Sequence, residues 1–121
     1  MRRLLAVIIM GCGLAHANCV VAEEQLLFIY GPECGACQRF MREVEINYSK
    51  TQEAQRLPIV RVTFDDWQAR QHPLSQCAVN PVFGTPTFIL LQACRETDRI
   101  TGYATDELFW ISHRRLMNRL D

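Results

Sequence analysis

The spacing of apolar positions changes from one segment of the chain to the next. Residues 26–30 form a short continuous apolar run that stops at a Gly-Pro pair, which is typical of a strand buried on both faces. From Cys37 to about Lys50, apolar side chains recur every three or four residues among charged ones, which predicts an amphipathic helix. The β-branched run at 59–64 predicts a second strand. This strand-helix-strand order is a βαβ unit, so the two strands should pair in parallel.

The second half of the chain predicts two more strands and a closing helix. Residues 87–91 and 99–103 are apolar or β-branched and are joined by a polar turn, which favours an antiparallel hairpin. Before them, 67–77 indicates a short helix that Pro73 interrupts. Thr105 can cap a final helix whose first turn holds two acidic residues. The predicted order is β-α-β-(α)-β-β-α, an α/β fold in which a four-stranded mixed sheet lies between flanking helices.

The first residues are set apart from this domain. Two arginines, an apolar run and a small-x-small step follow one another, an order that is typical of an export signal. We therefore expect 1–22 to be a signal peptide cut after residue 17 or 22, and 23–121 to be the mature domain. A lipidated Cys12, an uncleaved anchor and a buried first strand are the alternatives. Export predicts a periplasmic or secreted protein, in a compartment where disulfides persist.

Length and charge narrow the range of partners. A chain of 121 residues has room for one domain with one core. Its 13 basic and 13 acidic side chains are spread along the sequence and form no basic stripe. We therefore expect neither nucleic acid nor an anionic membrane surface as a partner, and we expect a monomer.

The candidate chemistry lies in a Cys-Gly-Ala-Cys sequence, Cys34 to Cys37, where the first strand should give way to the first helix. A cysteine at a helix N-terminus meets unpaired N–H groups and the positive end of the helix dipole, which favour its thiolate. Cys37 would then lie close enough to attack a mixed disulfide at Cys34. The pattern predicts a nucleophile, Cys34, and a resolving thiol, Cys37. A zinc site shared with Cys77 and Cys94 and an inert structural disulfide are the alternatives.

A proline stands at the first step of the third predicted strand, in the sequence Gly-Thr-Pro-Thr-Phe that begins at Gly84. Proline cannot donate a hydrogen bond to a strand ladder, and cis X-Pro bonds mark tight turns. A cis bond between Thr85 and Pro86 would turn the backbone groups of Thr85 outward, ready to pair with an extended substrate. An ordinary trans proline at a strand start is the alternative.

Together, these motifs resemble those of the thioredoxin superfamily over nearly the whole mature chain. The resemblance implies a cis-Pro86 that faces Cys34, disulfide exchange with protein thiols, and no cofactor or metal ion. The Phe109-Trp110 pair and the stretch at 47–51 are similar to the small periplasmic thioredoxins found with bacterial sulfur-oxidation systems. The domain has the size of a minimal glutaredoxin, but no glutathione site is evident.

Three departures from thioredoxins proper bear on the chemistry. Glu33 stands where they carry tryptophan, Ala36 replaces a proline, and Phe28 replaces a buried aspartate. Glu33 opposes the thiolate by charge repulsion, and nothing between the cysteines stabilises it, which favours a reductase or exchange role over a strong oxidase. We predict reduction or exchange of disulfides in exported client proteins, with a membrane protein as electron donor. A redox-sensing binding module and a disulfide-forming oxidase are the alternatives.

The remaining cysteines and the histidines receive plainer interpretations. Four cysteines in the mature chain suggest a second disulfide, but Cys94 should lie a strand length of about 13 Å from the Pro86 loop, and bridging requires Cα atoms within about 7 Å. We therefore expect two thiols, with Cys94 in an exposed turn. His72 and His113 have no metal-like partners in the sequence, so both are expected at the surface.

Overall fold

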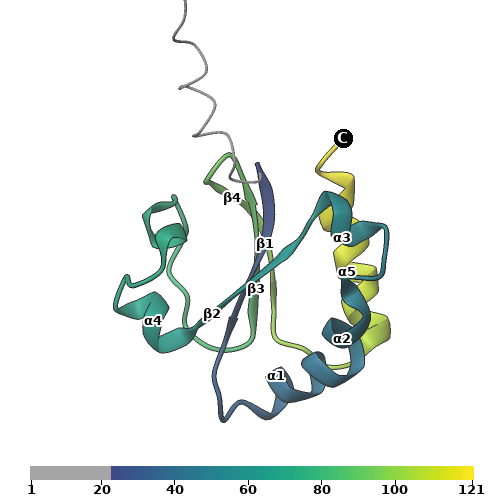
Figure 1. Ribbon diagram of the computed structural model, residues 1–121, viewed down its shortest axis with the longest axis horizontal. Coiled ribbons are helices and arrows are strands. Elements are labelled where there is room, and N and C mark those ends of the chain that lie inside the picture. Colours follow the sequence, from purple (N-terminus) through teal and green to yellow (C-terminus); the bar gives the residue numbers. More distant parts are fainter. Residues whose placement is uncertain (1–22) are drawn as a thin grey trace, which may run out of the picture.

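The computed structural model describes residues 23–121, so the expected export signal lies outside the described residues. Four strands form one mixed sheet in the order β2-β1-β3-β4 (Figure 1). They are β1 (Glu24–Tyr30), β2 (Ile59–Thr63), β3 (Thr87–Gln92) and β4 (Glu96–Thr101). β2 pairs with β1 in parallel, whereas β3 is antiparallel to both β1 and β4. The α/β fold and its four-stranded mixed sheet are therefore as the sequence predicts.

The helical segments are short, apart from the first run and the last helix. They are α1 (Gly35–Phe40), the π-helical η2 (Met41–Glu45), α2 (Ile46–Tyr48), α3 (Glu53–Arg56), α4 (Phe64–Gln68), the 3₁₀ turn η3 (Pro73–Gln76) and α5 (Asp106–Asn118). The run from α1 to α2 is one continuous helical segment, because the backbone stays helical at each junction. It begins two residues earlier than the sequence predicts, since Cys34 provides its N-cap.

Both faces of the sheet are covered, and each has its own core. On one face Leu26 and Phe28 of β1 pack beneath α1, α2 and α5, whereas on the other Leu27 and Ile29 pack against α4 and the segment after it. Figure 1 shows α1, α2, α3 and α5 on one side of the sheet and α4 on the other. This arrangement explains why residues 26–29 are uniformly apolar: alternate side chains enter two cores instead of one core and solvent.

Two element boundaries differ from the sequence prediction. β2 ends at Thr63, one residue early, because the Thr63 Oγ1 accepts a hydrogen bond from the Asp66 N–H and caps α4. β4 begins and ends earlier than predicted, at Glu96 and Thr101, and Gly102 follows with a φ of 84°. The β3–β4 turn is correspondingly tight, with only Ala93 to Arg95 between the two strands.

The expectation that Cys77 and Cys94 remain separate thiols is wrong, because the structure joins them in a disulfide with Cα atoms 4.7 Å apart. The prediction assumed that Cys77 lies near the Pro86 end of β3. Instead, the segment from Cys77 to Pro86 runs back along the sheet from the hairpin end. The Ala78 N–H donates to the Cys94 carbonyl at 3.0 Å, which holds the start of this segment at the turn.

The prediction of a surface position for His113 is also wrong. The side chain is 1% exposed, and its Nε2 lies 2.8 Å from the Tyr48 hydroxyl. That hydroxyl donates to the Leu57 carbonyl at 2.7 Å, so the imidazole Nε2–H donates to the hydroxyl in turn. Burial lowers the pKa of His113 to about 4. His72 is half-buried, and its Nδ1 accepts from the Leu74 N–H to cap η3.

Candidate redox site

Cys34 and Cys37 lie where β1 ends and α1 begins. Cys34 is the N-cap residue, with extended backbone angles of −84° and 110°, and its Sγ accepts a hydrogen bond of 3.1 Å from the Cys37 N–H. The two residues form a disulfide across a Cα separation of 5.2 Å. The sequence fixes this geometry locally, because two residues between the cysteines place them one helical turn apart.

The two sulfur-bearing residues differ in exposure. Cys37 is completely buried beneath α1 among the aromatic side chains of the first core, whereas Cys34 is half-buried at the surface. A reaction partner can therefore approach Cys34 and not Cys37. After such an attack, Cys37 would lie directly behind the reacting sulfur.

Phe28 of β1 lies in the same core as Cys37, and its side chain cannot take up or release a proton. It is fully buried in β1, and its ring stacks on Phe88 at 5.1 Å and meets the edge of Phe40 at 4.8 Å. Aromatic packing thus replaces any buried proton acceptor at this point of the strand. Proton transfer to or from the reacting sulfurs has to involve solvent or groups in the groove described next.

The loop before β3 faces the cysteines. The Thr85–Pro86 peptide bond is cis, and Pro86 is buried. Gly31 shows how near the two segments lie: a Cβ on Gly31 would be 3.5 Å from the Thr85 Oγ1 and 3.7 Å from the Cys34 Cβ. Within residues 23–121, the backbone N–H and C=O of Thr85 make no hydrogen bond to another backbone group. These two groups are therefore available to an incoming strand.

Cys34 and Thr85 open into one groove of about 460 Å³, which we call the redox groove. Its walls come from the turn before α1, the start of α4 and the loop before Pro86. They consist of Gly31, Pro32, Glu33, Cys34, Phe64, Asp65, Gly84 and Thr85.

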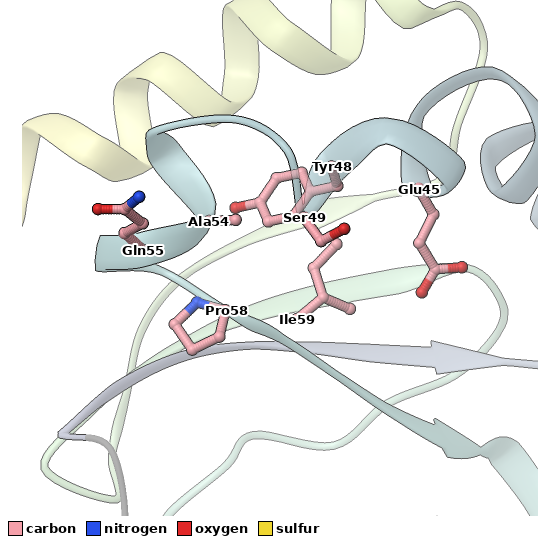
Figure 2. A pocket seen from close by; sticks show the side chains of 7 residues that line it. All are labelled: Glu45, Tyr48, Ser49, Ala54, Gln55, Pro58 and Ile59. Atoms are coloured by element: carbon pink, nitrogen blue, oxygen red, sulfur yellow. The ribbon is translucent and has the colours of Figure 1, made fainter.

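A second hollow, of about 400 Å³, lies between α2, α3 and the start of β2 (Figure 2). Its lining includes Tyr48 and Glu45 but no cysteine. Figure 2 shows the Glu45 carboxylate and the Gln55 amide at opposite ends of the hollow, so its polar groups do not converge on a common point. Burial raises the pKa of Tyr48, whose hydroxyl is occupied by Leu57 and His113. We assign this hollow no chemistry.

Within residues 23–121, no group of three or more His, Cys, Asp or Glu side chains is placed to hold a metal ion. The same residues include no helix with the length and apolar character needed to cross a membrane. Cys77 and Cys94 are joined to each other at the far end of the sheet and cannot complete a zinc site with Cys34 and Cys37.

Of the four residues singled out in the sequence, Cys34 and Thr85 line one groove, Cys37 is buried and bonded to Cys34, and Pro86 is buried next to Thr85. Sequence reasoning missed Phe64 and Asp65 as walls of the groove. A signal was present, since both follow a strand that pairs in parallel with β1, and parallel strands end at the same edge of a sheet.

Comparisons with known proteins bear on the fold of the chain as a whole. A family model for a thioredoxin-like domain matches residues 21–114. The chain is similar to the periplasmic thioredoxin SoxS from Paracoccus pantotrophus in its reduced form, with 29% identity, a TM-score of 0.72, and coverage of 82% of this chain and 100% of that chain. No curated protein sequence matches the chain.

Two more distant structures share the fold alone. Trxlp from Edwardsiella tarda EIB202 is 19% identical with a TM-score of 0.55, and covers 84% of this chain and 90% of its own. Thioredoxin from Aeropyrum pernix is 18% identical with a TM-score of 0.56, and covers 84% of this chain and 82% of its own. These structures and the present chain have the overall fold in common.

Proposed function

Since the chain belongs to the thioredoxin-like family, we propose that it is a thiol-disulfide oxidoreductase that reduces or exchanges disulfides of exported client proteins. One observation carries the proposal: a cysteine pair spans the N-terminus of α1 with Cys34 accessible and Cys37 buried behind it. A structural disulfide gains nothing from this asymmetry, whereas a two-step exchange requires it.

The reaction balances over two attacks. In the reduced protein, the Cys34 thiolate attacks one sulfur of a client disulfide, forms a mixed disulfide and releases the other client sulfur as a thiolate. Cys37 then loses its proton and attacks Cys34, which releases the second client thiolate and closes the Cys34–Cys37 bond. Two electrons pass from the protein dithiol to the client, and two protons restore the client thiols.

The N-cap position of Cys34 supports the first step. The Cys37 N–H donates to the Cys34 Sγ at 3.1 Å, and the other N–H groups of the first turn of α1 point the same way. These donors favour negative charge on this sulfur both as attacking thiolate and as leaving group. The covered Cys37 sulfur lacks this cap, so it serves as the resolving thiol.

The loop before β3 supports client binding. Among residues 23–121, the Thr85 N–H and C=O have no backbone partner, and the Thr85 side chain lies across Gly31 from Cys34. An extended client segment could form two backbone hydrogen bonds with Thr85 and so present its own sulfur to Cys34. Such pairing recognises polypeptide backbone and is independent of client sequence.

The direction of transfer and the compartment form part of the proposal. Glu33 disfavours the thiolate relative to a neutral neighbour, so the disulfide form is not unusually oxidising. Continued reduction then requires a dithiol donor, and we propose a membrane electron-donor protein. The SoxS structure supports an exported location, because that relative is described as periplasmic.

Two experiments test the function. Reduction of insulin by dithiothreitol should be accelerated by the wild-type chain and not by a Cys34→Ser variant; equal rates would leave only a binding role for this fold. The Cys37→Ala variant should accumulate mixed disulfides with client proteins through Cys34, visible as dithiothreitol-sensitive bands in an exported fraction. Recovery of no such adduct would contradict the enzymatic function.

A further inference from the structure

The redox groove carries an unbalanced charge. Among the described residues 23–121, the ionisable side chains that line it besides Cys34 are Glu33 and Asp65, and both are exposed. They come from different elements: Glu33 directly precedes Cys34, whereas Asp65 lies in the first turn of α4. In the part of the chain that the structure describes, no lysine or arginine lines this groove.

These two carboxylates differ from the acidic residues of the fold that are paired with arginines, such as Asp98. Within residues 23–121, neither the Glu33 nor the Asp65 carboxylate accepts a hydrogen bond from a side chain or forms an ion pair. By contrast, Asp98 is paired with both Arg115, at 3.0 Å, and Arg119, at 2.8 Å. Within residues 23–121, arginines therefore pair with carboxylates at the sheet edges but not with the two carboxylates of the redox groove.

We propose that the redox groove selects client segments that carry a lysine or arginine beside the reacting cysteine, with Glu33 and Asp65 as the specificity-determining residues. This inference rests on the proposed function, because it concerns the same site. To reach Cys34, a client sulfur must bring its flanking residues over the groove. A cation there is attracted by two carboxylates, whereas a client carboxylate is repelled by both.

The size of the expected preference follows from the exposure of the Glu33 and Asp65 carboxylates. One exposed charge pair at contact distance changes a rate or an affinity by about 1.5- to fivefold at low ionic strength, and the lysine and glutamate clients differ by both an attraction and a repulsion. The Debye length falls to about 3 Å at 1 M salt, so added salt should remove nearly all of the preference. The backbone pairing with Thr85 carries no charge and should be unaffected.

The experiment uses the full chain, reduced and freed of dithiothreitol. Three peptides differ only in the residue before a cysteine blocked as its thiopyridyl disulfide: lysine, glutamine or glutamate. Attack by Cys34 breaks this disulfide and releases thiopyridone, whose absorbance gives the rate. We expect the lysine peptide to react about tenfold faster than the glutamate peptide at low salt, and within about twofold at 1 M KCl.

Variants assign the preference to the two carboxylates. Glu33→Gln and Asp65→Asn should each reduce the lysine-to-glutamate rate ratio, and the double variant should bring it to about one. Asp66→Asn is the matched control: it removes one charge from the same helical turn but lies outside the groove, and it should retain the wild-type ratio.

Three outcomes would overturn the proposal. The double variant could keep the wild-type ratio, Glu33→Gln could speed all three peptides equally, or the ratio could persist at 1 M KCl. The second result would mean that Glu33 acts on the Cys34 thiolate and not on the client. A wild-type protein that reacts with all peptides at equal rates contradicts selectivity alone, whereas one that reacts with none contradicts the proposed function.

Discussion

The two disulfides of this domain lie at opposite ends of the same sheet. Cys34 follows the C-terminal end of β1, whereas Cys94 lies in the turn next to its N-terminal end, where the Ala93 N–H donates to the Glu23 carbonyl. Figure 1 shows these two ends, with α1 below β1 and the β3–β4 turn at the top. Both bonds join two cysteines, so any difference in their chemical roles has to arise from the surrounding residues.

The Cys34–Cys37 pair is local, whereas the Cys77–Cys94 pair links distant segments. The first spans a sequence separation of 3 and is bounded by the open redox groove. The second spans 17 residues and is reinforced by two backbone hydrogen bonds, from Ala78 to Cys94 and from Glu96 to Ala78. The comparison indicates that the Cys34–Cys37 bond is suited to exchange, whereas the Cys77–Cys94 bond anchors the segment that leads to Pro86.

Removal of the sulfur that faces the groove should have the largest effect. We expect Cys34→Ser to lower the rate of insulin reduction by at least about a thousandfold, because no other described thiol lies at a helix N-cap within a groove. The rate with dithiothreitol as donor measures this. The Cys94→Ser variant, which breaks the other disulfide, is the control. A comparable loss of insulin reduction in that variant would contradict the assignment of exchange to Cys34–Cys37 and of anchoring to Cys77–Cys94.

Removal of the anchoring disulfide should act on stability. We expect Cys77→Ala/Cys94→Ala to lower the free energy of unfolding by about 3 kcal/mol, because a closed loop of this length restricts the unfolded chain. Insulin reduction at 25 °C should remain within about twofold of wild type. Urea denaturation under oxidising conditions gives the first value.

The matched double variant removes the Cys34–Cys37 disulfide instead. Cys34→Ala/Cys37→Ala should cost less free energy of unfolding than Cys77→Ala/Cys94→Ala, since loop-closure entropy grows with the logarithm of loop length. Equal losses for the two double variants would show that the separation along the chain does not determine their structural contributions.

Acidic pH should weaken the fold that holds both disulfides. Burial holds the pKa of His113 at about 4 in the folded protein, against 6.5 when unfolded. The unfolded chain therefore takes up a proton on this imidazole at a higher pH than the folded chain. Its contribution to stability is complete above pH 6.5 and is lost as the pH falls towards 4, by about 3 kcal/mol in total.

Urea denaturation between pH 4 and pH 8 checks this contribution. His113→Gln should remove most of the slope below pH 6.5, whereas Tyr48→Phe should lower stability at every pH and keep a slope, because the imidazole remains buried. An unchanged slope in His113→Gln would assign the acid sensitivity to other groups. The measurement also defines the pH range in which the two disulfides can be compared in an intact fold.

The sequence predicts the redox end of the molecule better than the hairpin end. The apolar run of β1, the Gly-Pro stop and the helical spacing after Cys37 are local patterns, so they place Cys34 at a helix N-terminus without knowledge of the rest. Pro86 is predicted for a similar reason, because proline restricts the start of β3. These features cover most of the candidate site.

The hairpin end depends on contacts that no local pattern carries. Ala93 and Cys94 adopt positive φ angles of 52° and 62°, but neither is the glycine or asparagine that usually marks such a turn. The extended path from Cys77 to Pro86 has no periodicity, so the proximity of Cys77 to Cys94 was missed. His113 was misplaced for the same reason, because its partner Tyr48 comes from a helix 65 residues away in sequence.

The smallest expected effect is at Gly31, which lines the redox groove between Thr85 and Cys34. A methyl group on this residue would meet the Thr85 Oγ1 at 3.5 Å and the Cys34 Cβ at 3.7 Å, which are ordinary contact distances. Gly31→Ala should therefore fold normally and gain up to about 0.5 kcal/mol, because alanine restricts the unfolded chain more than glycine does.

In contrast to stability, the rate of disulfide exchange should fall in Gly31→Ala. The added methyl fills the space between Cys34 and Thr85 that a client segment has to enter, so we expect insulin reduction to slow by about two- to fivefold while reaction with a small thiol reagent is unchanged. Gly84→Ala is the control, because its added Cβ meets no atom within 4 Å. A loss of stability in Gly31→Ala, or equal slowing with small and large substrates, would mean that the gap is needed by the fold itself and that client access is limited elsewhere in the groove.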